Sequence, residues 1–239
     1  MKTSDLKLPE GVRARVGETP DEVALELADA VAGFLSVRLK DSPRASLVVS
    51  GGSTPLPFFK ALSDKDLDWS RVDVLLADER WVSEDAPASN TRLVRENLLQ
   101  NRAGAARFLS LKQPGDTPSE GLEAVKAELA DLALPLDVVI LGMGNDGHTA
   151  SLFPDAPELA HAMDPQCQEI VAATTPASQP QKRITLTLPP LRDARFTALH
   201  LKGEDKLATL SRAASDLESV MEMPVRAFLK PGLQVFWSP

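Results

Sequence analysis

The pattern in this sequence with the clearest chemical potential is an aspartate and a histidine separated by one glycine, at Asp146 and His148, directly after the hydrophobic run 138–141. A tight turn can aim both side chains at one cleft, where the carboxylate fixes the tautomer and orientation of the imidazole. We interpret the pair as a general base with its orienting partner. The alternative is an ordinary turn, in which Asp146 bonds its own backbone and His148 takes no part in chemistry.

A second candidate site is the segment 50–55, which reads Ser-Gly-Gly-Ser-Thr-Pro and follows another apolar run. Gly51 and Gly52 allow the backbone to approach a ligand closely, while free amides, a helix N-terminus and the hydroxyls of Ser53 and Thr54 favour an anion. The segment therefore predicts a phosphate cradle. It matches neither common phosphate-loop motif, so a plain strand-to-helix turn capped by Thr54 remains the alternative.

Charged residues follow a third apolar run, at Asp78, Glu79 and Arg80. Arg80 offers a planar fork for a phosphate, and Asp78 could position it or contact sugar hydroxyls. The alternative is a solvated charge cluster. Lys206 is a weaker candidate of the same kind, because a lysine in the first turn of a helix is usually solvated.

The elements that must position these residues alternate between short apolar strands and amphipathic helices, which indicates an α/β fold with a mainly parallel, Rossmann-like sheet in three α/β/α layers. Each candidate segment then lies at the carboxyl end of a strand, where such sheets bind ligands. Thr-Pro at 19–20 and 117–118, each followed by a capping glutamate, predicts two helix starts. We predict strands at 45–50, 72–77, 137–142, 169–173, 183–188, 195–202 and 233–237, and helices at 20–40, 89–101, from 117, 204–215 and 224–228.

Length and composition narrow the class of protein. The 239 residues, 43% hydrophobic and 25% charged, predict one globular domain over 1–239, with the polar stretch 174–182 as a surface loop. No apolar run approaches the roughly 18 residues needed to span a bilayer, and residues 1–5 do not begin a signal peptide, so we expect a cytoplasmic protein. The net charge of −8 disfavours nucleic-acid and membrane partners, and an anionic substrate would require a locally basic pocket.

The cysteine and histidine content argues against disulfides and metal sites. Cys167 is the single cysteine, so no intrachain disulfide can form, as is usual in a reducing compartment. The other two histidines, His161 and His200, carry no motif and form no H-x-x-x-H pair with His148. We expect no metal and no cofactor, and we interpret His161 and His200 as structural.

Taken together, these segments resemble the motif set of the 6-phosphogluconolactonase family, which belongs with the amino-sugar-phosphate isomerases in one superfamily. The resemblance runs in order from about Pro20 to Trp237. Its motifs are Ser50-Gly51-Gly52-Ser53-Thr54-Pro55, Asp78-Glu79-Arg80, Ser89-Asn90 with Asn97-Leu98-Leu99, Gly142 through Pro154, and Arg183-Ile184-Thr185-Leu186-Thr187.

The resemblance implies hydrolysis of 6-phospho-D-glucono-1,5-lactone, a sugar-phosphate lactone, in the oxidative pentose phosphate pathway. In this reading His148 activates water, Asp146 orients it, and the glycine turn supplies oxyanion donors. The phosphate would be held by the amides of 51–54, Arg80 and Lys206, with Arg183 as a further contributor. The substrate-binding positions are thus Gly51, Gly52, Ser53, Thr54, Asp78, Arg80, Gly144, Asn145, Arg183 and Lys206.

Two other functions remain open. The glucosamine-6-phosphate isomerase/deaminase branch shares several motifs, but it places an acidic residue where this chain has Phe153 and an aromatic residue where this chain has Arg80. Both differences favour the lactonase. A catalytically silent sugar-phosphate sensor is disfavoured by the complete Asp146–His148 pair and by the lack of a DNA-binding motif. The oligomeric state does not follow from the sequence.

Overall fold

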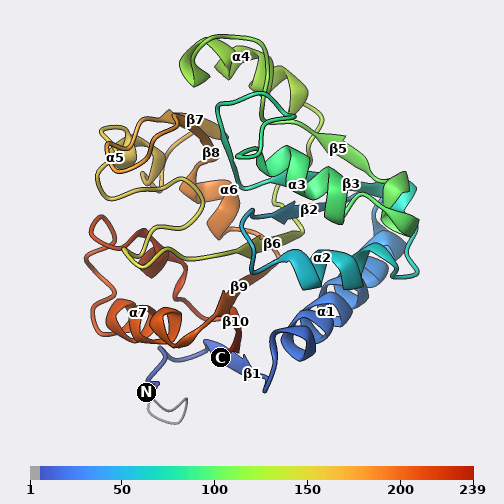
Figure 1. Cartoon of the computed structure of the whole chain (residues 1–239), viewed down its shortest axis with the longest axis horizontal. Coiled ribbons are helices and arrows are strands. Elements are labelled where there is room, and N and C mark those ends of the chain that lie inside the picture. The colour runs from blue at the N-terminus through green and yellow to red at the C-terminus, as the bar shows by residue number, and fades with distance from the viewer. Residues whose placement is uncertain (1–5) are drawn as a thin grey trace.

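The computed structural model describes residues 6–239, so the prediction for residues 1–5 lies outside it. Its centre is a seven-stranded sheet in the order β1-β10-β9-β6-β2-β3-β5, in which every neighbouring pair is parallel (Figure 1). Helices flank this sheet, which confirms the predicted α/β class. The strands are β1 (Arg13–Val16), β2 (Ala45–Val49), β3 (Val72–Leu76), β5 (Arg107–Leu109), β6 (Val138–Leu141), β9 (Phe196–Lys202) and β10 (Gln234–Ser238).

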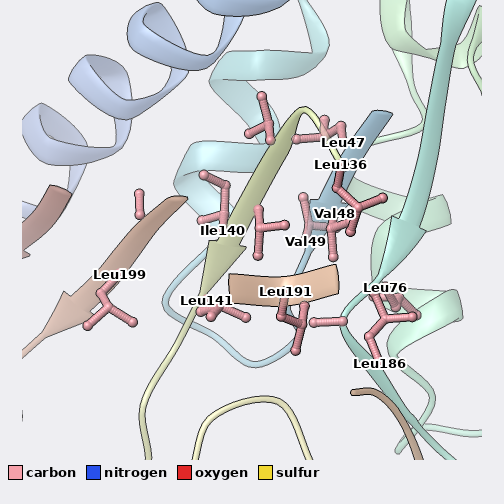
Figure 2. Close-up of a cluster of buried hydrophobic side chains, with 14 of the residues drawn as sticks. Leu47, Val48, Val49, Leu76, Leu136, Ile140, Leu141, Leu186, Leu191 and Leu199 are labelled. Carbon is pink, nitrogen blue, oxygen red and sulfur yellow. The ribbon is translucent and has the colours of Figure 1, made fainter. Parts of the chain in front are cut away.

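The central strands form the core because most of their residues are apolar. Every residue of β2, β3 and β6 is buried, as expected for parallel strands covered on both faces. Figure 2 shows side chains of β2 and β6 in this core. It also shows Leu191, which lies on the short helix Leu188–Arg192. The carboxyl ends of β2, β3 and β6 are therefore held at one rigid edge.

The two helix starts predicted from Thr-Pro pairs have the expected hydrogen bonds. The Thr19 hydroxyl accepts the Glu22 amide, and Thr117 and Glu120 form a reciprocal capping box. The helices are α1 (Pro20–Asp41), α2 (Leu56–Ser63), α3 (Asn90–Asn97), α4 (Pro118–Glu128), α5 (Leu159–Ala162), α6 (Leu188–Arg192) and α7 (Glu204–Ala214).

A second, antiparallel sheet of three strands, in the order β4-β8-β7, was not predicted. It is formed by β4 (Asp78–Arg80), β7 (Val171–Thr174) and β8 (Arg183–Leu186). In its register Arg80 lies directly opposite Arg183, so two residues that are 103 positions apart become cross-strand neighbours. This sheet brings the predicted Arg183 to the same edge as Asp78 and Arg80.

Several predicted boundaries were wrong by a few residues, each for a local reason. The helix expected at 89–101 begins after its N-cap Ser89 and ends at Asn97, and Asn101–Ala105 forms a separate 3-10 turn. The segment Pro224–Phe228 is also a 3-10 helix. Thr54 does not cap α2: Pro55 occupies the N-cap position, and no side chain caps that helix. Within residues 6–239, no helix has the length and apolarity to cross a membrane.

Candidate active site

The three predicted segments meet at one cavity of about 350 Å³ at the carboxyl edge of the parallel sheet. This size falls in the range of small-molecule sites. Ten predicted residues line it: Gly51, Gly52, Ser53, Thr54, Asp78, Arg80, Gly144, His148, Arg183 and Lys206. Asn145 and Asp146 lie outside the lining and contact residues that belong to it.

The Asp146–His148 pair has the geometry of an oriented base. The His148 ring Nδ1 lies 2.6 Å from Asp146 Oδ1, and the His148 amide donates to the same oxygen over 3.0 Å. A carboxylate at Nδ1 favours the tautomer with the proton on that nitrogen and leaves Nε2 as the proton acceptor. Burial disfavours the charged Asp146, but the His148 hydrogen bonds outweigh it and hold the pKa of this carboxyl below its usual value.

The turn that carries the pair is compact because glycine lies under the histidine ring. A Cβ on Gly144 would overlap the His148 imidazole, so any larger residue would displace the ring. The turn closes through the Gly144 amide and the His148 carbonyl at 2.9 Å. Glycine is therefore required at position 144 for the packing of the His148 ring.

Helix α7 holds the same turn from the other side. Lys206 Nζ donates to Asn145 Oδ1 over 2.7 Å, and Arg212 Nη2 donates to the Asn145 carbonyl over 2.7 Å. The predicted Asn145 is thus engaged with α7, and its role as a substrate ligand stays a prediction. Arg212 was missed because a helical arginine 67 residues away in sequence gives no local signal.

Phe153 is the residue by which the sequence analysis separated the lactonase interpretation from the isomerase one. Its buried ring stacks on His148 with centroids 4.1 Å apart and an interplanar angle of 26°. The Arg183 guanidinium lies on Phe153 as well, 5.5 Å from the ring centroid. The neighbour of the histidine ring at this position is therefore an apolar surface without a titratable group.

The glycine loop between β2 and α2 is tied to its neighbours by close contacts. The Ser50 hydroxyl donates to the Ile140 carbonyl over 3.0 Å, which joins the ends of β2 and β6. A Cβ on Gly51 would overlap the carboxamide of Asn90, a lining residue that sequence reasoning missed. The requirement for glycine at 51 thus comes from the approach of α3.

Arg80 and Arg183 lie side by side and keep unused hydrogen-bonding capacity. Arg80 donates through Nη1 to the Ala88 carbonyl over 2.7 Å, and Arg183 donates through Nη2 to Gln179 over 3.0 Å. In each of them Nε is enclosed and has no hydrogen-bond partner among the described residues. Burial lowers the pKa of Arg183, partly offset by Asp78. Two adjacent guanidinium groups with free donors form a natural site for an oxyanion.

The charge of the cavity is opposite to that of the whole chain. Its lining contains four basic side chains, Arg80, Arg183, Lys202 and Lys206, and one acidic side chain, Asp78. Asp78 accepts a 2.6 Å hydrogen bond from the Ser151 hydroxyl and lies 3.9 Å from Arg183. A protein with net charge −8 thus contains the local basic pocket that an anionic substrate requires.

Glu79, which lies between two lining residues, has a structural part. It is fully buried and accepts hydrogen bonds from the amides of Arg80, Asn90 and Thr91 and from two hydroxyls. Burial outweighs these bonds and raises the pKa of the Glu79 carboxyl above its usual value. This carboxylate attaches the N-terminus of α3 to β4, and so it places Asn90 beside the glycine loop.

His200 lines the cavity, although the sequence analysis interpreted it as structural. It lies at the carboxyl end of β9, is 7% exposed and packs edge-on against Phe58 with centroids 6.0 Å apart. His200 could have been identified from its position near the end of an apolar run, because the same rule identified the other segments.

His161 lies elsewhere, on α5, with its ring 3.8 Å from Cys167 Sγ. Across residues 6–239, no cluster of three or more His, Cys, Asp or Glu side chains is arranged to hold a metal ion.

The fold and the cavity define a class: an α/β protein with a basic pocket and an oriented histidine at the carboxyl edge of a parallel sheet. The sequence pattern described as "Glucosamine-6-phosphate isomerases/6-phosphogluconolactonase" matches residues 18–237. The chain belongs to this family.

Relatives separate the two branches of the family. A 6-phosphogluconolactonase of Pseudomonas aeruginosa is 47% identical over 239 residues, which is all of both chains. The crystal structure of a 6-phosphogluconolactonase from Shewanella baltica superposes with a TM-score of 0.93 at 44% identity, covering 98% of this chain and 100% of that one. A structure of a monomeric glucosamine-6-phosphate deaminase gives a TM-score of 0.74 at 16% identity over 95% and 97% of the two chains, a similarity of fold alone.

Proposed function

We propose that this protein is an enzyme that hydrolyses 6-phospho-D-glucono-1,5-lactone to 6-phosphogluconate, with His148 as the general base. The observation that carries the proposal is the meeting of the oriented His148 with two partly unpaired arginines in one cavity. A small molecule with a reactive carbonyl and a phosphate requires a base beside the carbonyl and cationic donors beside the phosphate. The names of the full-length relatives support the same reaction.

In the proposed mechanism, Nε2 of His148 removes a proton from a water molecule as the oxygen attacks the lactone carbonyl carbon. Asp146 stabilises the imidazolium that forms. The tetrahedral intermediate then breaks the bond to the ring oxygen, which takes the proton back from His148, and the product acid ionises to solvent. The glycine-rich turn predicts donors to the developing oxyanion, but the amides of Gly144, Gly147 and His148 already donate within the turn, so these donors must come from other amides of the cavity.

The phosphate would bind at the basic side of the cavity, to Arg80, Arg183, Lys206 and the amides of residues 51–54. These groups differ in kind from His148, because they hold a part of the substrate that does not react. Uniform binding of this sort lowers KM and leaves kcat nearly unchanged. The cytoplasm is the expected compartment, since the substrate is a charged metabolite and the single cysteine allows no intrachain disulfide.

The experiment that tests the proposal offers the purified protein two substrates. Freshly generated 6-phosphogluconolactone is followed by acid release above the enzyme-free rate, and glucosamine-6-phosphate is followed by ammonia release. We expect turnover of the lactone alone, because Phe153 supplies no carboxylate beside His148. Stoichiometric ammonia would establish the deaminase reaction instead, and turnover of neither would indicate a sensor.

A further inference from the structure

We infer that His200 is a substrate-binding residue, which hydrogen-bonds to a hydroxyl of the sugar ring and so contributes to substrate specificity. This inference rests on the proposed function, because it requires a polyhydroxylated sugar phosphate in the cavity. It assigns a role to a residue that lies outside the recognised motifs.

The first observation is the place of the side chain. His200 is one residue beyond the last register pair between β6 and β9, Leu141 with Leu199. His200 lines the same cavity as His148 and the arginines. At the ends of adjacent strands, His200 and the turn that begins at Gly142 face one ligand volume, so a small sugar phosphate can reach both.

The second observation is the missing partner of the imidazole. Within the described part of the chain, three enclosed side-chain nitrogens lack a hydrogen-bond partner: Nε of Arg80, Nε of Arg183 and Nδ1 of His200. All three belong to residues that line this cavity. Buried polar groups are almost always paired, and an unpaired one costs stability. Because Nδ1 of His200 is enclosed, only the other ring nitrogen, Nε2, is left for a ligand in the cavity.

The third observation is the neutrality of this ring, which selects its ligand chemistry. Its pKa is lowered from 6.5 to about 4 by burial alone, without a charged partner. With Nδ1 enclosed and unpaired, the proton of the neutral ring is better placed on Nε2, which then acts as a donor. A neutral donor suits a hydroxyl, whereas the phosphate has four cationic side chains in the same lining.

Measuring both stability and kcat/KM of His200→Leu separates a substrate-binding role from a packing role. Replacing His200 by Leu removes a buried polar group, so the free energy of unfolding at pH 7.5 should stay the same or rise. The proposal expects kcat/KM for the lactone to fall in the same variant by roughly threefold to tenfold, the effect of one neutral hydrogen bond. A merely structural histidine would not lower activity in a protein that is as stable as the wild type.

Two further variants serve as controls. His200→Gln keeps an amide donor near the position of Nε2 and should recover part of the lost kcat/KM. His161→Leu makes the same change at a histidine outside the cavity and should leave kcat/KM unchanged. Wild-type kcat/KM in a folded His200→Leu would overturn the inference, even with the lactonase reaction established. No lactone turnover by the wild-type protein would overturn the proposed function instead.

A measurement on the wild-type protein keeps the test independent of variant folding. Histidine labelled with ¹⁵N reports each ring nitrogen by NMR, and His200→Gln assigns the His200 signals. Saturation with 6-phosphogluconate, the expected product, should shift the Nε2 resonance of His200 and leave that of His161 in place. An unmoved His200 signal in a product complex would contradict the contact.

Discussion

The charged side chains at the two ends of the parallel sheet differ in how completely they are hydrogen-bonded. At the amino end, Asp73 on β3 accepts hydrogen bonds from both Arg44 and Arg107, with the shortest N–O distances of each pair at 2.6 and 2.7 Å. At the carboxyl end, Arg80 and Arg183 each keep an enclosed Nε without a partner. The same residue types are thus saturated at one end and left open at the other.

The difference indicates what each cluster contributes. Burial disfavours the charged Asp73, but the two arginines outweigh it and hold the pKa of that carboxyl below its usual value. The stability that this cluster contributes is therefore present above the ordinary carboxyl pKa and is lost as the pH falls through the lowered value. The open cluster is compensated only in part, by Asp78 beside Arg183, and its unpaired donors cost stability. A substitution should therefore change stability at the amino end and substrate handling at the carboxyl end.

The largest effect is expected from His148→Asn, which removes the base and keeps a polar side chain. The kcat for the lactone should fall by ~10²- to 10⁴-fold, with little change in thermal stability or product affinity, because His148 is part of the open end. Rates are measured against the enzyme-free background, and folding is checked by calorimetry. A folded variant with most of its corrected kcat would make His148 an ordinary turn residue and direct the search for a base to Asp78.

The next effect tests the saturated end. Asp73→Asn should lower the free energy of unfolding by roughly 3 kcal/mol, the lower part of the range for a broken buried pair, because the two arginines are partly exposed. The kcat/KM of the folded variant should not change. Chemical denaturation measures the first quantity, and Asp66→Asn in an exposed pair with Arg102 is the matched control, expected within about 0.5 kcal/mol. A reduced kcat/KM in folded Asp73→Asn would contradict the expectation that the amino end affects stability alone.

The sequence predicted which segments lie at the carboxyl end of the sheet better than it predicted the contacts that hold those segments together. Short apolar runs followed by Gly51, Asp78 and His148 were sufficient to place three segments at one edge, because parallel strands share their carboxyl ends. Strong local signals also identified the helix starts at Thr19 and Thr117.

What sequence reasoning missed depends on contacts between distant residues. Strand β4 is the polar tripeptide Asp-Glu-Arg, without a β pattern, and it is a strand because β8 pairs with it. The adjacency of Arg80 and Arg183 follows from that pairing. His200 carries no motif, and it packs against Phe58 on α2, about 140 residues earlier in the sequence. Local periodicity contains no information about these partners.

A smaller effect is expected from Arg80→Met, which replaces a partly unpaired cation by an apolar chain of similar length. The KM for the lactone should rise about tenfold to hundredfold, the effect of a charge-assisted hydrogen bond, while kcat changes little. The variant should also show a weaker dependence of KM on salt, and its stability should stay within about 1 kcal/mol. Lys206→Ala should behave in the same way. Wild-type KM in both variants would remove the proposed phosphate contacts.

The smallest effect concerns pH and His200, the third unpaired group of the open end. Its folded pKa of about 4 lies below the unfolded value of 6.5, so the unfolded chain binds more protons as the pH falls between these values. The contribution of His200 to stability is therefore intact above pH 6.5 and is lost progressively toward pH 4. Between pH 7.5 and pH 5.5 the loss amounts to a factor of about ten in the unfolding equilibrium. His200→Leu lacks this loss, so its stability relative to wild type should rise by that amount over the same range, measured by denaturation at both pH values. A relative stability of His200→Leu that is the same at both pH values would mean that this ring is not held neutral by burial.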